Sequence, residues 1–326
     1  MKFCEFTLYW RRIGNILRNQ RIMKRLLTFA VVLAALASAQ MLHATRLVGV
    51  KTIDKDYIMV HFRDGEVRYR DDATGPSAYL GHTFVEGDDT LFVFGQRLSP
   101  EIAADPAGWV ISSMDDQTFG TRNAVAAWRK SKPMNTDNTL TSELDHWIFL
   151  KLPKSMKQGC TYTVSVPEEL GSDISQASVT FDVWTSQSEA VHVNIIGYSP
   201  QEAVKAADLY LWLGDGGQRD YSAFEGNKVY LYNVDTGAKT KVGSVKFWKE
   251  ASEHPNEAGE KNLTGSDVWT VDFKYSKPGR YRLVVDGVGC SMDFYISDDV
   301  VYIVWCEPCK FCIAAKPCHL TLGIAA

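Results

Sequence analysis

The densest group of reactive side chains is a run of cysteines close to the C-terminus: Cys306, Cys309, Cys312 and Cys318. Thiolates at this spacing can hold a zinc ion or an iron–sulfur cluster. The spacing before Cys318 departs from the C-x3-C-P ending of bacterial ferredoxins, and no flanking element is long enough to build a core. We therefore favour an irregular, non-native tail over a metal site, and expect no cofactor.

Acidic pairs are the second source of chemistry, and they occur at Asp71-Asp72, Asp88-Asp89, Asp115-Asp116, Glu168-Glu169 and Asp298-Asp299. A glycosidase needs two carboxyl groups roughly 5 to 9.5 Å apart across a cleft. Neighbouring residues of a strand point to opposite faces, so a sequence pair does not meet this need. Turn chemistry explains most of these pairs. We assign no catalytic residue.

Histidines and aromatic residues are the remaining candidates for functional residues. The histidines show no metal-ligand spacing, and His61 and His192 lie in strand patterns typical of hydrogen-bonded structural residues. Nine tryptophans exceed what a small core needs, and exposed indole faces can stack on sugar rings. The candidates for sugar binding are Trp248, which precedes a polar loop, Trp212 and Trp269, with Trp109 and Trp128 behind them. Core packing is the alternative for each, because large aromatics dominate sandwich interiors.

The elements that must position these residues are short strands. Alternating apolar runs separated by turn residues recur from residue 46 onward, and the class predicted from this pattern is all-β. Asp64-Gly65 between two such runs predicts a tight hairpin turn. The best helical pattern covers only 124–128.

A polar break at 185–189 divides the strands into two units, 46–186 and 191–298. The second unit has seven short strands, the number found in an immunoglobulin-like β-sandwich. Both units end on a glycine turn followed by a tyrosine, Tyr162 or Tyr281. We expect both tyrosines to bond back to upstream backbone and to have no functional role. Residues 299–326 are interpreted as the start of a linker and the irregular tail.

The N-terminus has the features of a targeting segment. A basic stretch begins at Met23, an apolar run follows over 26–37, and Ala37-Ser38-Ala39 matches a cleavage signal. The apolar run is shorter than the ~20 residues that span a bilayer, so no membrane span is expected. Residues 1–39 are therefore interpreted as an upstream extension plus a Sec-type signal peptide. The mature protein is expected to be periplasmic or secreted.

Bulk composition argues against two classes of protein. The chain has 326 residues, is 45% hydrophobic and carries a net charge of −4. This apolar content argues against a disordered chain. Its sequence pI of about 6.0 argues against a nucleic-acid-binding domain.

Segments of the second unit resemble a known module. Residues 192–200 (HVNIIGYSP) look like the VNQxGYxP opening of the immunoglobulin-like module found at the N-terminus of many family 9 glycoside hydrolases, the cellulase Ig-like domain. Residues 278–287 (PGRYRLVVDG) are similar to its penultimate strand, and 291–297 (SMDFYIS) to its last. The resemblance covers about 191–298, and 299–311 look like the linker into the catalytic barrel.

This resemblance implies a non-catalytic role. The family's catalytic module is an (α/α)6 barrel with a D-A-G-D aspartate motif and a distant glutamate acid, and neither is present in this sequence. We expect the N-terminal part of an exported cellulase-like glycoside hydrolase, truncated before the barrel that is its C-terminal partner and inactive alone. The alternative is a stand-alone pair of carbohydrate-binding modules that use exposed tryptophans on polysaccharide. A redox or metal protein built on the tail is a third reading.

Overall fold

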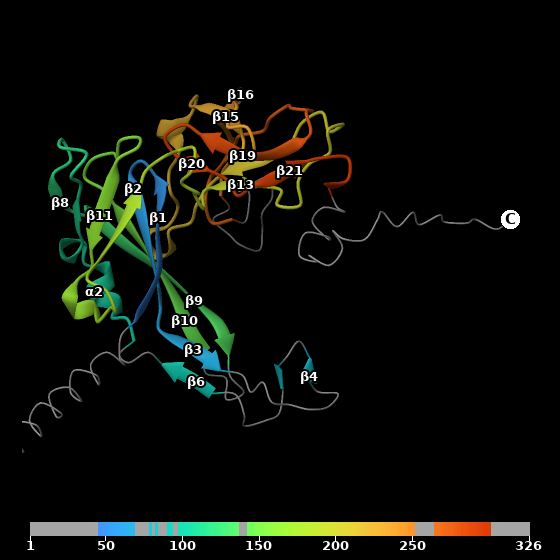
Figure 1. Cartoon of the computed structure of the whole chain (residues 1–326). Helices are drawn as coiled ribbons and strands as arrows, with labels where there is room; N and C mark the ends of the chain where they lie inside the picture. The colour runs from blue at the N-terminus through green and yellow to red at the C-terminus, as the bar shows by residue number, and fades with distance from the viewer. Residues whose placement is uncertain are drawn as a thin grey trace, which may run out of the picture.

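The structure is a computed structural model that describes residues 45–68, 78–79, 82–83, 90–93, 97–136, 142–251 and 264–300. These residues are nearly all β, with one short α-helix, α2 (Pro100–Ala104), so the predicted all-β class is confirmed (Figure 1). The predicted signal peptide and the four tail cysteines lie outside the described residues and stay predictions.

The first unit consists of two antiparallel sheets. One sheet has the order β1 (Arg46–Asp54), β2 (Tyr57–Arg63), β10 (Ser142–Lys151) and β9 (Ala126–Thr136). The other has the order β12 (Gln176–Thr180), β11 (Thr161–Ser165), β7 (Val110–Ser112) and β8 (Thr121–Asn123). Two single turns, η1 (Pro106–Gly108) and η2 (Glu168–Leu170), complete it. The side chains between the two sheets form one hydrophobic core, here called the first core, that includes Trp109, Phe119 and Tyr162.

The second unit repeats this two-layer arrangement. One sheet has the order β13 (Val191–Val193), β14 (Ala207–Leu209), β18 (Val268–Thr270) and β17 (Lys246–Lys249). The other has the order β16 (Lys239–Ser244), β15 (Lys228–Asn233), β19 (Gly279–Val285) and β20 (Gly289–Cys290), and β21 (Phe294–Ile296) also pairs with β19. Two single turns, η3 (Gly214–Gly216) and η4 (Ser222–Phe224), lie in the connection after β14.

The sheet β1-β2-β10-β9, here called the shared sheet, contributes side chains from its two faces to two cores. Ile58, Val60 and Phe62 of β2 point into the first core. Tyr57 and Met59, the alternate residues of the same strand, belong to the core of the second unit. Successive residues of a strand face opposite sides, so one strand supplies both cores. In Figure 1, β1 and β2 accordingly lie between the green strands of the first unit and the orange and red strands of the second.

The segment that joins the two units is held against the second one. Residues 186–188 run parallel to β20: the N–H of Cys290 donates to the carbonyl of Ser186 at 3.0 Å, and the N–H of Ser188 donates to the carbonyl of Cys290 at 2.9 Å. Trp184 packs its ring against Tyr230 and Tyr232 of β15. The polar break predicted at 185–189 therefore connects two units that are in direct contact.

A buried ion pair lies where the units meet. Arg219, between η3 and η4, donates through Nε to Asp54 Oδ2 at 2.9 Å, and its guanidinium lies 4.4 Å from the ring centre of Tyr57. Burial raises the pKa of Asp54, and the guanidinium opposes that rise. Asp54 is fully buried, so its negative charge depends on the cation of Arg219, while the N–H of Asp56 donates to its other oxygen at 2.8 Å.

The turn η3 packs closely on β9. A side chain at Gly214 would collide with the backbone of Arg129, and one at Gly216 would collide with the ring of Trp128. Gly214 also has φ +77°, a conformation that favours glycine. Two glycines thus permit the second unit to cover Trp128.

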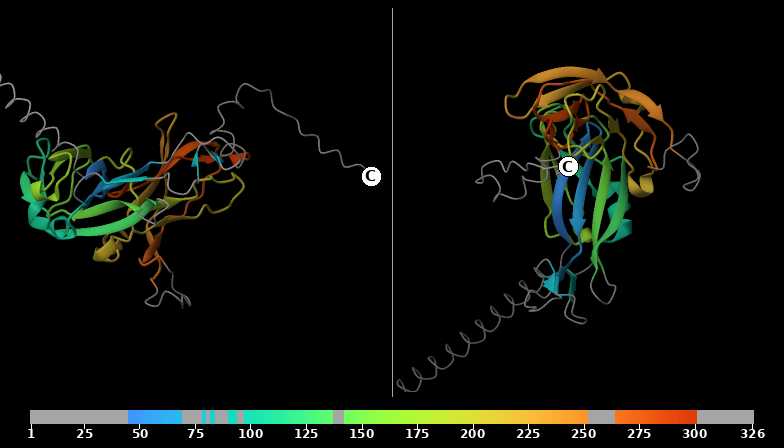
Figure 2. Two further views of the ribbon diagram at one scale, coloured as in Figure 1. Left: turned by 90° about the horizontal axis from the view of Figure 1, so that it is seen from below. Right: turned by 90° about the vertical axis from the view of Figure 1, so that its right-hand side faces the viewer.

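Two local predictions are wrong. Asp64-Gly65 makes no hairpin: β2 pairs with β1 and β10, and the chain continues extended into β3 (Gly65–Arg68), which pairs with β6 (Thr90–Val93). The carboxylate of Asp64 accepts the N–H of Leu144 instead of forming a turn. The helical pattern at 124–128 leads into β9, where Ala127 packs in the first core and Trp128 packs against the second, as alternate residues of a strand do. Figure 2 shows the β3–β6 ribbon at the end of the shared sheet away from the second unit. A further pair of short strands consists of β4 (Ala78–Tyr79) and β5 (His82–Thr83).

The predicted bonds from both tyrosines to upstream backbone are confirmed. The hydroxyl of Tyr162 accepts the N–H of Lys157 at 2.8 Å, and that of Tyr281 donates to the carbonyl of Lys277 at 3.3 Å. Both rings are buried. Each tyrosine therefore closes a corner by bonding to backbone a few residues upstream.

No helix among the described residues has the length and apolar character to cross a membrane.

We expect the variant Arg219→Met to lower the free energy of unfolding by about 3–5 kcal/mol at neutral pH, because it leaves the carboxylate of Asp54 buried without its cation. Without Arg219 the folded-state pKa of Asp54 rises further, so the protonated form becomes the tolerated one. The deficit relative to the unsubstituted protein should shrink as pH falls toward about 4 and grow toward pH ~7. Urea denaturation at several pH values measures this. Arg122→Met, at an exposed position of β8, is the control and should cost under about 1 kcal/mol; equal losses in both variants would contradict the interpretation.

Candidate functional site

The predicted sugar-binding tryptophans separate into exposed and buried side chains. Trp248 is 58% exposed and Trp212 is 46% exposed. Trp269 is only 3% exposed, because it points from the inner strand β18 into the second core, where its ring meets Tyr221. Trp269 therefore offers no face to a ligand, and its proposal as a platform is wrong. Trp109 is buried and Trp128 lies beneath η3, so they are not platforms either.

Phe247 is an exposed aromatic residue that the sequence analysis missed. It precedes Trp248 on β17, and its ring meets Trp269 edge-on with the ring centres 5.7 Å apart while nearly half of the residue stays exposed. The pairing of β17 with β18 shifts register between Phe247 and Lys249, which leaves Trp248 as the extra residue of a bulge. The adjacent Phe-Trp pair between two lysines was the sequence signal for this exposed edge. Trp212, Phe247 and Trp248 are here called the aromatic surface.

Asp267 organises the backbone around the aromatic surface. Its Oδ1 accepts the N–H of Ala251 at 2.8 Å, close to Trp248 in sequence. Its own N–H donates to Oε1 of Gln218 at 2.6 Å, and Gln218 forms the bridge partner of Trp212. One carboxylate and one amide therefore hold the segments that carry both exposed tryptophans, and they place polar groups next to apolar rings.

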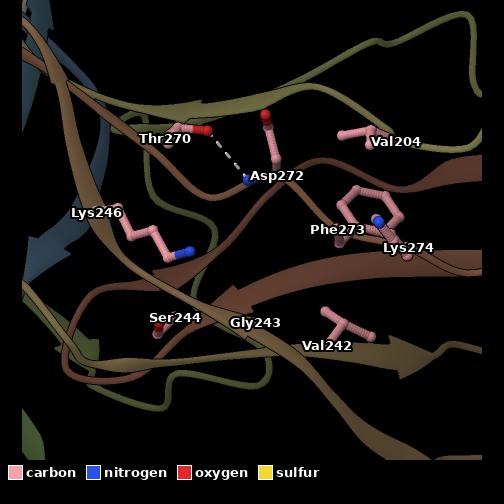
Figure 3. Close-up of a pocket in the computed structure, with 9 residues that line it drawn as sticks. All are labelled: Val204, Val242, Gly243, Ser244, Lys246, Thr270, Asp272, Phe273 and Lys274. Atoms are coloured by element: carbon pink, nitrogen blue, oxygen red, sulfur yellow. Dashed lines mark hydrogen bonds between the residues drawn. The ribbon is translucent and has the colours of Figure 1, made fainter.

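A pocket of about 360 Å³ lies at the corner between β16, β17 and β18 (Figure 3). Among the described residues that line it, Asp272 is the one carboxylate, and its Oδ1 accepts the N–H of Ala207 at 2.9 Å. Lys246 and Lys274 bring cations to the same pocket, and Ser244 and Thr270 bring hydroxyl groups. A pocket with a single carboxylate suits binding of a polar molecule and does not supply the acid and nucleophile of a glycosidase.

Other acidic and histidine residues hold the fold together. Asp116 is buried, and its pKa is lowered by the bond from Lys157, then by bonds from Thr118 and Tyr162. It therefore begins a turn, as the sequence suggested, because its Oδ1 accepts the N–H of Thr118 at 3.1 Å, but it is a buried anchor and not a solvated residue. His61 bonds to Asp145 at 2.8 Å and His192 to the carbonyl of Tyr210 at 3.1 Å, as expected of structural histidines.

The segment that resembles the opening of the cellulase Ig-like module ties the start of the second unit to its end. The hydroxyl of Tyr198 accepts the N–H of Asn194 at 2.9 Å and donates to the carbonyl of Ala206 at 2.6 Å. The N–H of Tyr198 donates to the carbonyl of Tyr295 in β21, also at 2.9 Å. Tyr198 thus fixes its own loop and joins that loop to the last strand.

The end of the second unit lies close to the loop that contains Gly197. Gly197 has φ +112°, and a side chain there would collide with the carbonyl of Tyr295 and with Val300. Exposed apolar side chains accompany this close approach: Ile195 and Ile196 in the loop, and Met292 before β21. Ile195 and Met292 line a groove of about 510 Å³ that continues to Lys51 of the shared sheet. We call Ile195, Ile196 and Met292 the exit surface.

No metal site is present among the residues that the structure describes, where no group of three or more His, Cys, Asp or Glu side chains is placed to hold an ion. Cys306, Cys309, Cys312 and Cys318 lie beyond the last described residue, so their metal prediction is untested. Cys160 and Cys290 are free thiols, and burial raises the pKa of Cys290 to about 11. Such a thiol is unreactive at neutral pH.

Comparison with known proteins identifies no family. No protein-family model matches the sequence, and no curated protein matches it significantly. Among solved structures, the chain is similar to the N-terminal part of the bacterial S-layer protein SbsC at 12% identity and a TM-score of 0.25, covering 81% of this chain and 46% of that one. It is also similar to the S-layer protein rSbsC(31-844) at 12% identity and a TM-score of 0.28, covering 81% of this chain and 27% of that one. The chain spans less than half the length of either structure, and these TM-scores are too low to bear on architecture or function.

We expect Tyr198→Phe to lower the free energy of unfolding by roughly 1–3 kcal/mol, because it leaves the N–H of Asn194 and the carbonyl of Ala206 without their shared partner. Urea denaturation followed by tryptophan fluorescence measures the loss. Tyr210→Phe, which keeps the ring that stacks on His192 at 4.0 Å, is the matched control. A Tyr198→Phe variant as stable as the control would show that this hydroxyl does not hold the loop.

Proposed function

We propose that this chain is the non-catalytic N-terminal part of an exported, cellulase-like glycoside hydrolase, and that it supports a catalytic module joined to it after residue 300. One observation carries the proposal: the opening segment 192–200 and the last strand β21, both of which resemble the cellulase Ig-like module, meet through Tyr198 at the point where the chain leaves the second unit. The exit surface lies at this same point.

The exposed apolar side chains of the exit surface fit a role in packing against another module. Isolated exposed apolar residues are ordinary, but a set next to a groove is typical of a surface that another module covers. Ile195 and Met292 line the same groove, and it ends at the salt bridge between Lys51 and Glu189, whose closest atoms are 3.7 Å apart. An apolar centre with a charged rim is the usual composition of such an interface.

The shared sheet supports the same reading. A support must hold its partner in a fixed direction, and two units that share one sheet resist bending relative to one another. The described pockets at the β16–β17 corner and at the exit surface contain at most one carboxylate each. A support of this kind needs no acid pair of its own, because the catalytic module that it supports supplies both acids.

The purified chain should release no reducing sugar from soluble β-glucan above the buffer background. It should also lengthen the half-life at elevated temperature of a family 9 catalytic barrel prepared without its own Ig-like module. The double variant Ile195→Glu and Met292→Glu should remove that protection, because it places charge at an apolar contact.

Val204→Glu is the matched control, since Val204 is an exposed apolar residue that lines the other pocket. Glucan turnover by the chain itself would overturn the proposal, and so would a double variant that protects the barrel as well as the control does.

A second function is favoured by the aromatic surface. Trp212 and Trp248 expose about half of each indole, and Asp267 and Gln218 place hydrogen-bonding groups beside them. Apolar ring faces next to polar groups match the two sides of a sugar ring. We propose that this surface binds a polysaccharide chain.

Trp248→Ala should abolish the retardation of the chain in native gels that contain β-glucan or xylan, and Trp212→Ala should weaken it. Met114→Ala removes an apolar side chain that is also exposed, but in the first unit, and should migrate like the unsubstituted protein. If the unsubstituted chain is not retarded, or if the Trp248 variant is retarded equally, the aromatic surface does not bind these polysaccharides.

A further inference from the structure

Three polar side chains lie together at the end of the shared sheet remote from the second unit: Ser131 of β9, His146 of β10, and Asp64, which follows β2. Ser131 and His146 are directly opposite residues of the β9–β10 pair. The N–H of Arg129 donates to Asp215, away from β10. N–H directions alternate along a strand, so residues two apart, such as Arg129 and Ser131, direct their N–H groups to the same side. Ser131 therefore points its N–H away from β10 and forms a non-hydrogen-bonded pair with His146, the kind of pair in which side chains approach most closely.

The distances form a relay from hydroxyl to imidazole to carboxylate. Ser131 Oγ lies 2.7 Å from His146 Nδ1. His146 Nε2 lies 3.6 Å from Asp64 Oδ2. The other oxygen of Asp64 accepts the N–H of Leu144 at 2.8 Å, which fixes the carboxylate. A nucleophile bonded to a base, with the base oriented by a third group, is the general arrangement of an activated serine.

Burial distinguishes this group from an ordinary surface contact. The side chains of His146 and Asp64 are 4% and 1% exposed, whereas Ser131 is exposed. His146 Nε2 and Asp64 Oδ2 are buried without a hydrogen-bond partner and face each other, and the guanidinium of Arg97 lies 3.8 Å from the same oxygen of Asp64. Burial alone would raise the pKa of Asp64, but His146 and the N–H of Leu144 outweigh it and the pKa is lowered. The carboxylate is therefore charged at neutral pH.

The same strand also supplies groups that can stabilise negative charge on a reacting carbonyl. Arg129 donates through Nη1 to Ser131 Oγ. The N–H of Ser131 points outward, and β9 is an edge strand of the shared sheet. A guanidinium and a backbone N–H next to the nucleophile are the kinds of donor that stabilise an oxyanion.

We propose that Ser131 is a nucleophile that cleaves esters of short acyl groups, with His146 as its base and Asp64 as a positioning residue. Ser131 Oγ attacks the ester carbonyl and transfers its proton to His146 Nδ1. The bond from carbon to the alcohol oxygen breaks, and the alcohol leaves with that proton. Water then hydrolyses the acyl-serine and restores the hydroxyl. A short acyl group fits because Ser131 is exposed on an edge strand. This site is independent of the proposed support and sugar-binding surfaces.

The test is covalent labelling of the full chain with an alkyl fluorophosphonate, which loses fluoride as the serine oxygen bonds to phosphorus. Peptide mass spectrometry should locate the label on Ser131, and Ser131→Ala should abolish it. His146→Gln should slow labelling by at least about 100-fold, the usual contribution of a general base. Hydrolysis of p-nitrophenyl acetate should fall in parallel.

Two control variants replace a histidine and a serine that lie outside the group of Ser131, His146 and Asp64. His61→Gln removes the other His–Asp pair, in which His61 bonds to Asp145 on the opposite face of the same sheet. Ser178→Ala removes an exposed strand serine whose hydroxyl bonds to Thr163. Both should label at Ser131 as the unsubstituted protein does, and circular dichroism confirms the fold of each variant.

Asp64→Asn tests the positioning role, because the amide oxygen can still accept the N–H of Leu144 but the charge facing His146 is lost. The variant should label Ser131 more slowly than the unsubstituted protein while its circular dichroism is unchanged. Asp64→Glu, which keeps the carboxylate, should recover part of the lost rate, and a purely structural defect would not show this difference. A folded chain that is not labelled at Ser131, a His146→Gln variant that labels at the original rate, or an Asp64→Asn variant that labels at the original rate would each overturn the proposal.

Discussion

The contribution of the shared sheet to two hydrophobic cores is the constraint from which the rest of the structure follows. Strands β1, β2, β10 and β9 give alternate side chains to two cores, so neither unit can be completed without the other. A sheet covered on both sides must be apolar on both sides, and β2 is accordingly apolar over its first four residues. Only beyond the edge of the second unit does β2 alternate with polar residues, and there the pairs of His61 with Asp145 and of His146 with Asp64 appear.

This constraint also explains the buried charges at the junction. The turn between β1 and β2 enters the second unit, and its polar groups need partners there: Arg219 reaches Asp54, and the carbonyl of Gly287 accepts the N–H of Lys55 at 2.9 Å. An ion pair in such a place adds little net stability compared with apolar packing, but either charge alone is costly. It therefore restricts the two units to one relative orientation, as the glycines of η3 do by permitting close contact with β9.

The features that the sequence predicted best are those set by local pattern. Alternation located most strands, and the glycine-to-tyrosine spacing located both corners, because these depend on a few neighbouring residues. The errors arose where distant residues decide. Asp64-Gly65 has the composition of a turn, but the N–H of Leu144 holds Asp64 in an extended chain. Trp269 has the composition of a platform, but its strand is an inner one. The contact of Ser131 with His146 depends on the register of β9 against β10, which no spacing in the sequence reveals.

The bulge at Trp248 has a further consequence for the solubility of the protein. Strand β17 lies at the margin of its sheet, and an extended apolar margin can recruit a strand from another molecule and begin aggregation. The irregular pairing between Phe247 and Lys249 interrupts the ladder at this margin, and Lys246 and Lys249 place a positive charge on each side of the two aromatic residues. Like charges would face each other if two copies of this margin came together. The protein can thus keep large rings in water at a sheet margin without offering other chains a template for self-association.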